Sequence, residues 1–341
     1  MLRLPELDFL SPSTIEEALQ MLADDPSGTR VLAGGTDLVP NLKRRHQHAR
    51  RLVSLGRLAS LRGVSGDPAH GLRVGAMTTL RSILKNEVLE QHWPGLIAAV
   101  RSISSPVLQS MGTIGGNLCL DTRCTYYNQT EEWRSAIGYC MKEAGDTCWV
   151  APSSSRCWAI AASDAAPLLC AIGARVRLAS TRGERELAVE ALLCDDGIAY
   201  LSKAPDEVLT DVLLPPAGTW KATYWKLRRR GSIDFPVLGV GTALRVGKNG
   251  VVEDVRIFLG AVASAPVRAL AAESILQGHI LDETTLVSAG KAAQEVATAL
   301  DNTDFTMTWR RQMIPHYVAG TLRELADLPR VGLLGADGLE C

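Results

Sequence analysis

The sequence has little net charge and no long apolar run. Its 341 residues include 36 Lys and Arg and 37 Asp and Glu, which gives a formal net charge of −1 with both signs interspersed. Nucleic acids and anionic membranes attract an excess of positive charge, so the sequence predicts neither partner. The sequence contains no run of about 18 apolar residues, which is the length needed to cross a bilayer. Its N-terminus lacks the charged-then-apolar order of a secretion signal. We therefore expect a cytoplasmic protein.

Common cofactor signatures are missing as well. The sequence contains neither the G-x-G-x-x-G dinucleotide motif nor the G-x-x-x-x-G-K-[ST] phosphate loop. None of the six histidines has a spacing typical of a metal site or a catalytic triad. With 46% hydrophobic and 21% charged residues, the chain is nevertheless long enough to bury a core and to divide into two or three domains.

Four of the eight cysteines lie within residues 124–157, namely Cys124, Cys140, Cys148 and Cys157. Their surroundings are polar and lack a helix or strand period, and disulfides are rare in reducing compartments, so we interpret them as metal ligands. The spacing matches neither the short C-x2-C pairs of structural zinc sites nor the C-x2-C-x2-C run of bacterial ferredoxins. Zinc and an iron–sulfur cluster both remain open on chemistry alone. Cys119 is a rival fifth candidate for this site, although a packing role is the interpretation we favour, and Cys170 and Cys194 are interpreted as packing residues.

Two glycine-rich segments are candidates for binding a phosphate-bearing cofactor. The first, "GGTD" from Gly34, follows a strand-like segment and precedes a short helical one. The second, "GTIGGN", runs from Gly112 to Asn117. Glycine allows close backbone approach to a ligand, and Thr and Asn supply side-chain hydrogen bonds. Ordinary turns also contain glycine pairs, but two such segments predict one extended cofactor between them.

Hydrophobic periodicity indicates alternating helices and strands. Ser13 or Thr14 caps a predicted amphipathic helix, and strands are expected near residues 30–33, 51–55 and 72–79. Residues 80–103 predict a helix that Pro94 splits. Further strands are expected at 174–180, 183–189 and 207–215, and a hairpin at 243–260 turns at Asn249 and Gly250. Helices are expected from about 267 to 325, and the chain is expected to divide near residues 213–219.

Four segments, taken in order, resemble one protein family. They read "LAGGTDL" from Leu32, "GTIGGNL" from Gly112, "ASDAAPLLCAIGARVRL" from Ala162 and "YWKLRRRGSIDFPVLGVGTAL" from Tyr224. This order resembles the FAD-binding medium subunit of the molybdenum hydroxylases, the family of xanthine dehydrogenase and carbon monoxide dehydrogenase, over almost the whole chain. The resemblance implies an α+β fold. It consists of a two-part FAD-binding domain at about 1–216 (about 1–57 and 58–216), a C-terminal α+β domain at about 217–328 and a tail at 329–341.

The resemblance also implies roles for single residues. It places no catalytic residue on this chain and implies an FAD cradle formed by Leu32, Ala33, Gly34, Gly35, Thr36, Asp37, Leu38, Gly112, Thr113, Gly115, Gly116 and Asn117. Asp164 is implied to bind a ribose hydroxyl, although a turn or helix-cap role is the alternative. Leu214 matches a position beside the isoalloxazine or adenine ring. Lys226 matches a lysine near the flavin ring, where its charge would stabilise reduced flavin; a solvated basic run is the alternative.

The 46 residues between Asn117 and Asp164 contain an insert at about 120–160. With its four cysteines and its "DTCWVAP" context it resembles the beta subunit of the 4-hydroxybenzoyl-CoA reductases, which carries a 4Fe-4S cluster. This resemblance implies that Cys124, Cys140, Cys148 and Cys157 are the cluster ligands. Because the insert lies outside both glycine-rich segments, we expect loss of a cysteine to leave FAD bound.

The function implied is electron transfer in anaerobic aromatic degradation. Ferredoxin would supply electrons, and a molybdenum-binding large subunit and a 2Fe-2S small subunit would be the partners in a dimer of heterotrimers. One alternative is the FAD subunit of an NAD-linked molybdenum hydroxylase with another aromatic or heterocyclic substrate. A third hypothesis is a binding protein that zinc stabilises.

Overall fold

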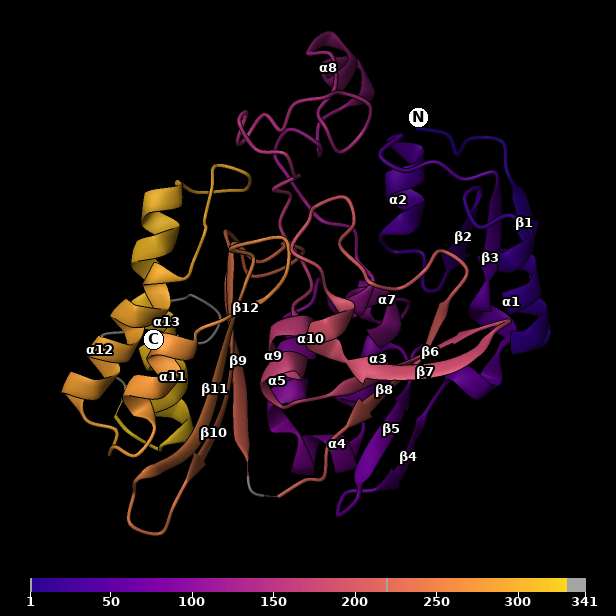
Figure 1. Ribbon diagram of the computed structural model, residues 1–341. Helices are drawn as coiled ribbons and strands as arrows, with labels where there is room; N and C mark the ends of the chain where they lie inside the picture. The colour runs from indigo at the N-terminus through magenta and orange to yellow at the C-terminus, as the bar shows by residue number, and fades with distance from the viewer. Residues whose placement is uncertain (1, 219, 330–341) are drawn as a thin grey trace.

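The computed structural model describes residues 2–218 and 220–329, and it contains three sheets with helices packed around them (Figure 1). The predicted α+β class is confirmed. Most of the predicted tail, residues 330–341, lies outside the described residues. Among the described residues, no helix combines the length and apolar character needed to cross a membrane.

The first sheet is parallel, and its strand β2 leads into the first glycine-rich segment. Its strands are β1 (Asp8–Leu10), β3 (Arg51–Ser54) and β2 (Thr29–Leu32), in that order. Helix α1 (Ile15–Asp24) begins where the Thr14 side chain accepts a hydrogen bond from the Glu17 N–H, as the sequence predicts for this cap. The chain leaves β2 and enters helix α2 (Leu38–Lys43), so residues 33–37 form the connection between them.

The second sheet is antiparallel. Its order is β4 (Val64–Asp67), β5 (Gly71–Gly75), β8 (Val208–Leu214), β6 (Arg175–Ser180) and β7 (Gly183–Ala188). The helices of this part are α3 (Leu80–Leu84), α4 (Glu87–His92), α5 (Pro94–Arg101), α6 (Pro106–Gln109), α7 (Ile114–Leu118), α9 (Ala165–Ala171) and α10 (Val189–Leu192). Two short 3-10 turns, Leu55–Arg57 and Ala59–Leu61, connect the first and second sheets.

The predicted helix at 80–103 is divided twice rather than once. Pro94 occupies the first turn of α5, as the sequence predicts. A second break follows Leu84, because the Asn86 side chain accepts a hydrogen bond from the Leu89 N–H and starts α4 as a new helix.

The third sheet forms the C-terminal part. It is antiparallel, in the order β12 (Val267–Arg268), β11 (Val252–Gly260), β10 (Leu238–Val246) and β9 (Lys221–Leu227). Helices α11 (Leu270–Leu276), α12 (Glu283–Glu295) and α13 (Met307–Leu325) cover one face, and α5 and α9 contact the sheet from the second part (Figure 1). The predicted hairpin turn lies between β10 and β11.

The cysteine-containing insert is mostly irregular chain. Its only helix among the described residues is α8 (Glu131–Ala136), which stands at the top of Figure 1. The base of the insert is closed by Arg123 and Ile160, which exchange two backbone hydrogen bonds of 2.9 and 2.7 Å. The insert has a small buried cluster of its own, which includes Tyr127 and Ala159 with the cysteines, and polar contacts add to it.

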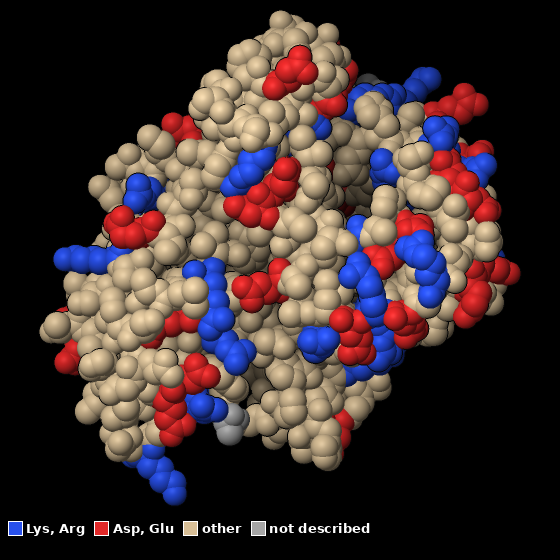
Figure 2. Space-filling model, in the orientation of Figure 1, with Lys and Arg blue, Asp and Glu red and all other residues tan. Residues whose placement is uncertain are grey.

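Charged side chains are dispersed over the surface. Figure 2 shows Lys and Arg interspersed with Asp and Glu on one face, with no large area of one sign. This distribution agrees with the formal net charge of −1.

A buried ion pair joins the second and third parts. Lys226 on β9 donates to Asp164 at the start of α9 over 2.9 Å, and both side chains are almost fully buried. The Lys226 ammonium also donates to the carbonyls of Ser102 and Asp234, while the Tyr224 hydroxyl donates to the second Asp164 oxygen. Burial raises the pKa of Asp164, and Lys226 opposes that shift by stabilising the carboxylate.

We predict that Lys226→Met lowers the free energy of unfolding by about 3–5 kcal/mol, because it leaves the buried Asp164 carboxylate uncompensated. Lys221→Met is the matched control. Lys221 forms an exposed ion pair with Asp327, and loss of such a pair costs at most about 1 kcal/mol. Urea-induced unfolding measures both changes, and equal losses in the two variants would contradict the prediction.

Candidate functional site

A cavity of about 630 Å³ lies where the first and second parts of the chain meet. Its volume is in the range of pockets that hold drug-sized or cofactor-sized ligands. Three segments contribute most of the wall: residues 29–38, residues 112–121 and residues 198–209. The cavity thus lies between the two glycine-rich segments that the sequence singled out.

The glycines bring the two segments into direct contact. A Cβ at Gly34 would lie only 1.9 Å from the carbonyl oxygen of Met111, and a Cβ at Gly115 would lie 2.7 Å from the Cβ of Ala76. Gly35 has a φ of +73°, a left-handed conformation that side-chain-bearing residues rarely adopt. These positions need glycine for the packing of the loops themselves, before any ligand is considered.

Side-chain hydrogen bonds fix the second segment. The Thr113 hydroxyl oxygen accepts the Gly116 N–H at 3.1 Å and caps the short helix α7. The Asn117 side-chain oxygen accepts the Ser163 hydroxyl at 2.8 Å and the Ala165 N–H at 3.2 Å. Asn117 therefore ties the glycine-rich segment to the start of α9, across the whole length of the insert.

Charged groups of both signs line the large cavity. Burial raises the pKa of Asp37, and the neighbouring Arg123 guanidinium opposes that shift. Burial lowers the pKa of Lys203, whose ammonium donates to the carbonyls of Ala204 and Glu207. The ring of Tyr200 lies in the same wall, and burial raises the pKa of its hydroxyl.

Most of the predicted cofactor residues lie at this cavity. The lining includes Ala33, Gly34, Gly35, Asp37, Leu38, Gly112, Thr113, Gly115, Gly116 and Asn117. Five other predicted residues are not part of the lining: Leu32, Thr36, Asp164, Leu214 and Lys226. Leu214 lies in β8 beside Leu72, and Asp164 and Lys226 contact each other. The individual FAD contacts remain predictions.

Several lining residues were not found from the sequence. Asp121, Ile198, Tyr200 and Lys203 face the cavity although no motif marks them. Cys119 lines the same cavity and not the cysteine site, and burial raises the pKa of its thiol. The sequence contains one indication for two of these residues: Cys119 and Asp121 come directly after the second glycine-rich segment.

The four cysteines of the insert surround a second, much smaller cavity. The cavity measures about 10 Å³, which is room for about one water molecule. Cys124, Cys140, Cys148 and Cys157 are 6%, 8%, 5% and 5% exposed. They are free thiols that share one cavity, so the structure brings all the predicted metal ligands together.

Burial and backbone hydrogen bonds act on these thiols in opposite directions. Burial raises the pKa of Cys124 to about 12 and that of Cys157 to about 11. Backbone N–H groups, which stabilise negative charge on sulfur, donate to Cys124 from Tyr126 and Tyr127, to Cys140 from Lys142 and Glu143, and to Cys157 from Ala159. A bound metal would supply positive charge that stabilises the deprotonated sulfurs.

The geometry bears on which metal group the cysteines fit. Within residues 2–218 and 220–329, no group of three or more His, Cys, Asp or Glu side chains is placed to hold a single metal ion. A tetrahedral zinc site needs its sulfurs about 3.8 Å apart, because each Zn–S bond is about 2.3 Å. A four-iron cluster separates its cysteine sulfurs further, because its core lies between them. Four cysteine sulfurs are the ligand set of both a structural zinc ion and a four-iron cluster, and a cluster requires the cavity of about 10 Å³ to widen.

Comparison with known proteins identifies the family. The FAD binding domain in molybdopterin dehydrogenase matches residues 5–217, and the CO dehydrogenase flavoprotein C-terminal domain matches residues 222–325. The chain belongs to the FAD-binding medium subunits of the molybdenum hydroxylases. It is thus an FAD subunit of a molybdenum-hydroxylase-type dehydrogenase, and the predicted family is confirmed.

Individual relatives agree with this assignment. The chain is 27% identical over 296 residues to the xanthine dehydrogenase FAD-binding subunit of Escherichia coli O157:H7, covering 85% of this chain and 87% of that one. It is 26% identical over 323 residues to the glyceraldehyde dehydrogenase medium chain of Sulfolobus acidocaldarius, covering 94% and 99%. The predicted fold is confirmed by carbon monoxide dehydrogenase from Hydrogenophaga pseudoflava, with a TM-score of 0.78 at 22% identity over 95% of this chain and 98% of that one.

We predict that Gly34→Ala lowers the affinity for FAD about tenfold, because the added methyl group forces the two glycine-rich segments apart. Gly231→Ala is the matched control, since a Cβ there meets no atom within 4 Å. The flavin-to-protein ratio of purified protein and a titration with FAD measure the effect. Full affinity in the Gly34 variant, with the overall fold retained, would remove these segments from the flavin site.

Proposed function

We propose that the chain is the FAD- and 4Fe-4S-carrying electron-transfer subunit of a 4-hydroxybenzoyl-CoA reductase. The single observation that supports this most strongly is the insert, in which four buried cysteines share one cavity and backbone N–H groups donate to three of their sulfurs. When bound, FAD exchanges electrons singly or in pairs and a four-iron cluster exchanges one at a time, so together they connect one-electron and two-electron carriers. Ferredoxin is the proposed donor.

The residues of this chain bind and orient the two groups. The touching glycine-rich segments present backbone to the dinucleotide, and residues 198–209 close the wall of the large cavity. The four cysteines are the proposed cluster ligands. Asp164, Leu214 and Lys226 are retained as proposed FAD contacts, with Lys226 and Asp164 held by each other.

The overall reaction defines what the partners must supply. Reductive removal of a ring hydroxyl from the aromatic thioester consumes two electrons and two protons and releases water. We place this chemistry on a molybdenum-binding large subunit, with a 2Fe-2S small subunit between it and this chain. Relatives named as medium chains or medium subunits support such an assembly, which we propose to be a cytoplasmic dimer of heterotrimers.

We also propose the predicted division of the chain. The FAD-binding domain ends near residue 216 and the C-terminal domain begins at 217, which agrees with the separation between β8 and β9. The insert at about 120–160 is a separate unit built onto the first domain.

A second candidate is the FAD subunit of an NAD-linked molybdenum hydroxylase with another aromatic or heterocyclic substrate. Its support is the similarity to the xanthine dehydrogenase FAD-binding subunit and, at 25% identity, to the nicotine 6-hydroxylase medium subunit of Paenarthrobacter nicotinovorans. Reduction of bound flavin by NADH, with no need for the cysteines, would favour this candidate.

We predict about four iron and four sulfide ions per chain in protein purified without oxygen, because the four cysteines complete a cluster. Cys148→Ala should lose most of this iron. Cys194→Ala is the matched control, because that partly buried thiol lies outside the cysteine site. Metal and sulfide analysis decides the matter, and one zinc per chain without sulfide would contradict the cluster.

A further prediction concerns assembly. The chain alone should bind FAD but reduce no 4-hydroxybenzoyl thioester, because the reacting substrate is assigned to the molybdenum subunit. Adding the large and small subunits should restore turnover, measured as loss of the thioester with a low-potential donor. Turnover by this chain alone would be incompatible with the proposed division of labour.

A further inference from the structure

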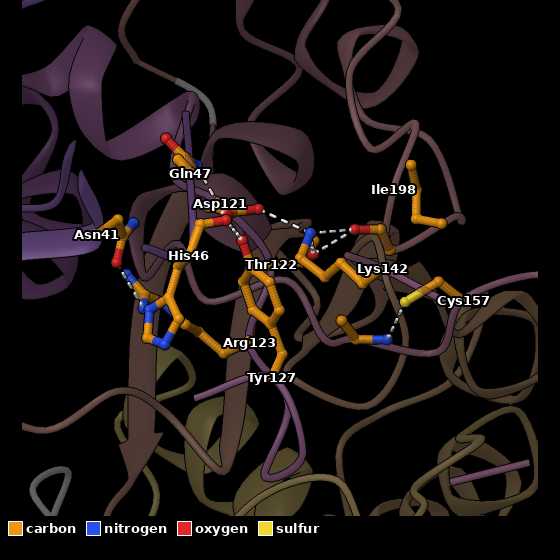
Figure 3. Close-up of polar contacts among 12 residues, drawn as sticks. Asn41, His46, Gln47, Asp121, Thr122, Arg123, Tyr127, Lys142, Cys157 and Ile198 are labelled. Carbon is orange, nitrogen blue, oxygen red and sulfur yellow. Dashed lines mark hydrogen bonds and ion pairs between the residues drawn. The ribbon is translucent and has the colours of Figure 1, made fainter. Parts of the chain in front are cut away.

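The insert carries a buried lysine beside the large cavity. Lys142 lies two residues after Cys140, and its side chain is 5% exposed. Its ammonium donates to the Asp121 carboxylate and the Thr122 hydroxyl, each at 2.8 Å, and to the Gly197 carbonyl at 2.5 Å. An ammonium has three N–H donors, so this set of partners uses all of them. Figure 3 shows the Lys142 ammonium directed toward Asp121 and Thr122.

These acceptors belong to two segments of the large cavity's wall. Asp121 lines the cavity directly, and its backbone N–H donates to the Asp37 carboxylate at the first glycine-rich segment. Gly197 immediately precedes residues 198–201, which also line the cavity. Lys142 therefore contacts two wall segments from outside the cavity. These segments, about 75 residues apart in sequence, also meet directly, because the Thr122 hydroxyl donates to the Gly197 carbonyl.

The same contacts reach the cysteine site. The Gly197 N–H donates to the Cys157 carbonyl at 2.9 Å, and a Cβ at Gly197 would lie 2.6 Å from the Cys157 sulfur. The Lys142 ammonium also lies 5.0 Å from the ring centre of Tyr127 and 5.2 Å from that of Tyr200, which faces the large cavity. Cysteine site and cavity wall are thus in direct contact through Gly197 and Lys142.

We propose that Lys142 is a positioning residue of the FAD site, which holds the two wall segments in the arrangement that accepts the flavin dinucleotide. The insert is then part of the flavin site, which differs from the expectation that the insert lies outside it and that loss of a cysteine leaves FAD bound. By linkage, FAD binding must also order the insert. This inference deepens the FAD-binding part of the proposed function and is independent of the cluster and of the reductase assignment.

The first test is an FAD titration of the full-length chain after removal of flavin. Lys142→Met should raise the Kd for FAD about tenfold or more, within the usual size of a coupling between sites. In Lys142→Met/Asp121→Asn, no buried carboxylate is left unpaired, so the apoprotein should regain thermal stability while its Kd stays raised. Lys221→Met, which removes a lysine from an exposed ion pair, is the matched control and should bind FAD as the parent does.

The double variant separates positioning from stability. A parental Kd in the double variant would mean that Lys142 only compensates Asp121, and would overturn the proposal. Iron content, measured on the same samples, shows whether a weaker flavin site accompanies loss of the cysteine site. A chain that lacks iron altogether but shows the raised Kd contradicts the cluster assignment and leaves the role of Lys142 supported.

A second measurement tests the parental chain directly. FAD added to the parental apoprotein should slow amide hydrogen exchange in the wall segments and also in residues 140–145 of the insert. The Lys221→Met control should show the same protection. If FAD protects the wall segments but leaves residues 140–145 unchanged, the proposal is wrong.

Discussion

The buried contact of Lys142 with Asp121 connects the large cavity with the cysteine-containing insert. A charge removed from water costs several kcal/mol unless a partner compensates it, so each of these side chains requires the other. The same principle applies around the insert. Arg123 pairs with Asp37, and the buried Arg134 guanidinium donates to the carbonyls of Arg44 and Arg45 after α2. The irregular insert has only a small buried cluster of its own, and these cations additionally hold it against the flavin-binding part.

This arrangement gives the large cavity two kinds of support. On one side the glycine-rich segments meet where Gly34 packs against the Met111 backbone, and Gly115 packs against Ala76 just after β5. On the other side, residues 198–209 end in the buried core through Val208 and Leu209, and they begin beside Gly197, whose carbonyl accepts a hydrogen bond from Lys142. The packing of Gly34 and Gly115 follows from their lack of a side chain and does not need bound FAD. The hydrogen bond from Lys142 to the Gly197 carbonyl, in contrast, depends on the insert. In the proposed enzyme, electrons would enter through the insert and continue through a flavin whose pocket the insert helps to form.

The sequence was sufficient for local features and for the family, but not for contacts between distant irregular segments. The Thr14 cap, the Pro94 break and the hairpin at Asn249 and Gly250 depend on a few neighbouring residues, and the structure has each of them. The glycine-rich segments could be identified because close backbone approach to a ligand favours glycine, whereas the packing of Gly34 against Met111 is visible only in the structure. Lys142 and Asp121 are 21 residues apart in chain without a regular period, so nothing local indicates that they meet. Lys226 was expected at the flavin ring, and only the fold reveals that it contacts Asp164.

The central claim is that low-potential electrons enter at the cysteine site and pass to the flavin. The most direct measurement compares the parental chain with Cys148→Ala in the assembled enzyme, with rates expressed per bound flavin. We predict that the variant loses thioester reduction driven by reduced ferredoxin but retains the reverse, oxidative reaction when an artificial acceptor takes electrons from the flavin. An unchanged ferredoxin-driven rate per flavin in a variant that lacks the cluster would contradict this claim and leave the four cysteines a structural role only.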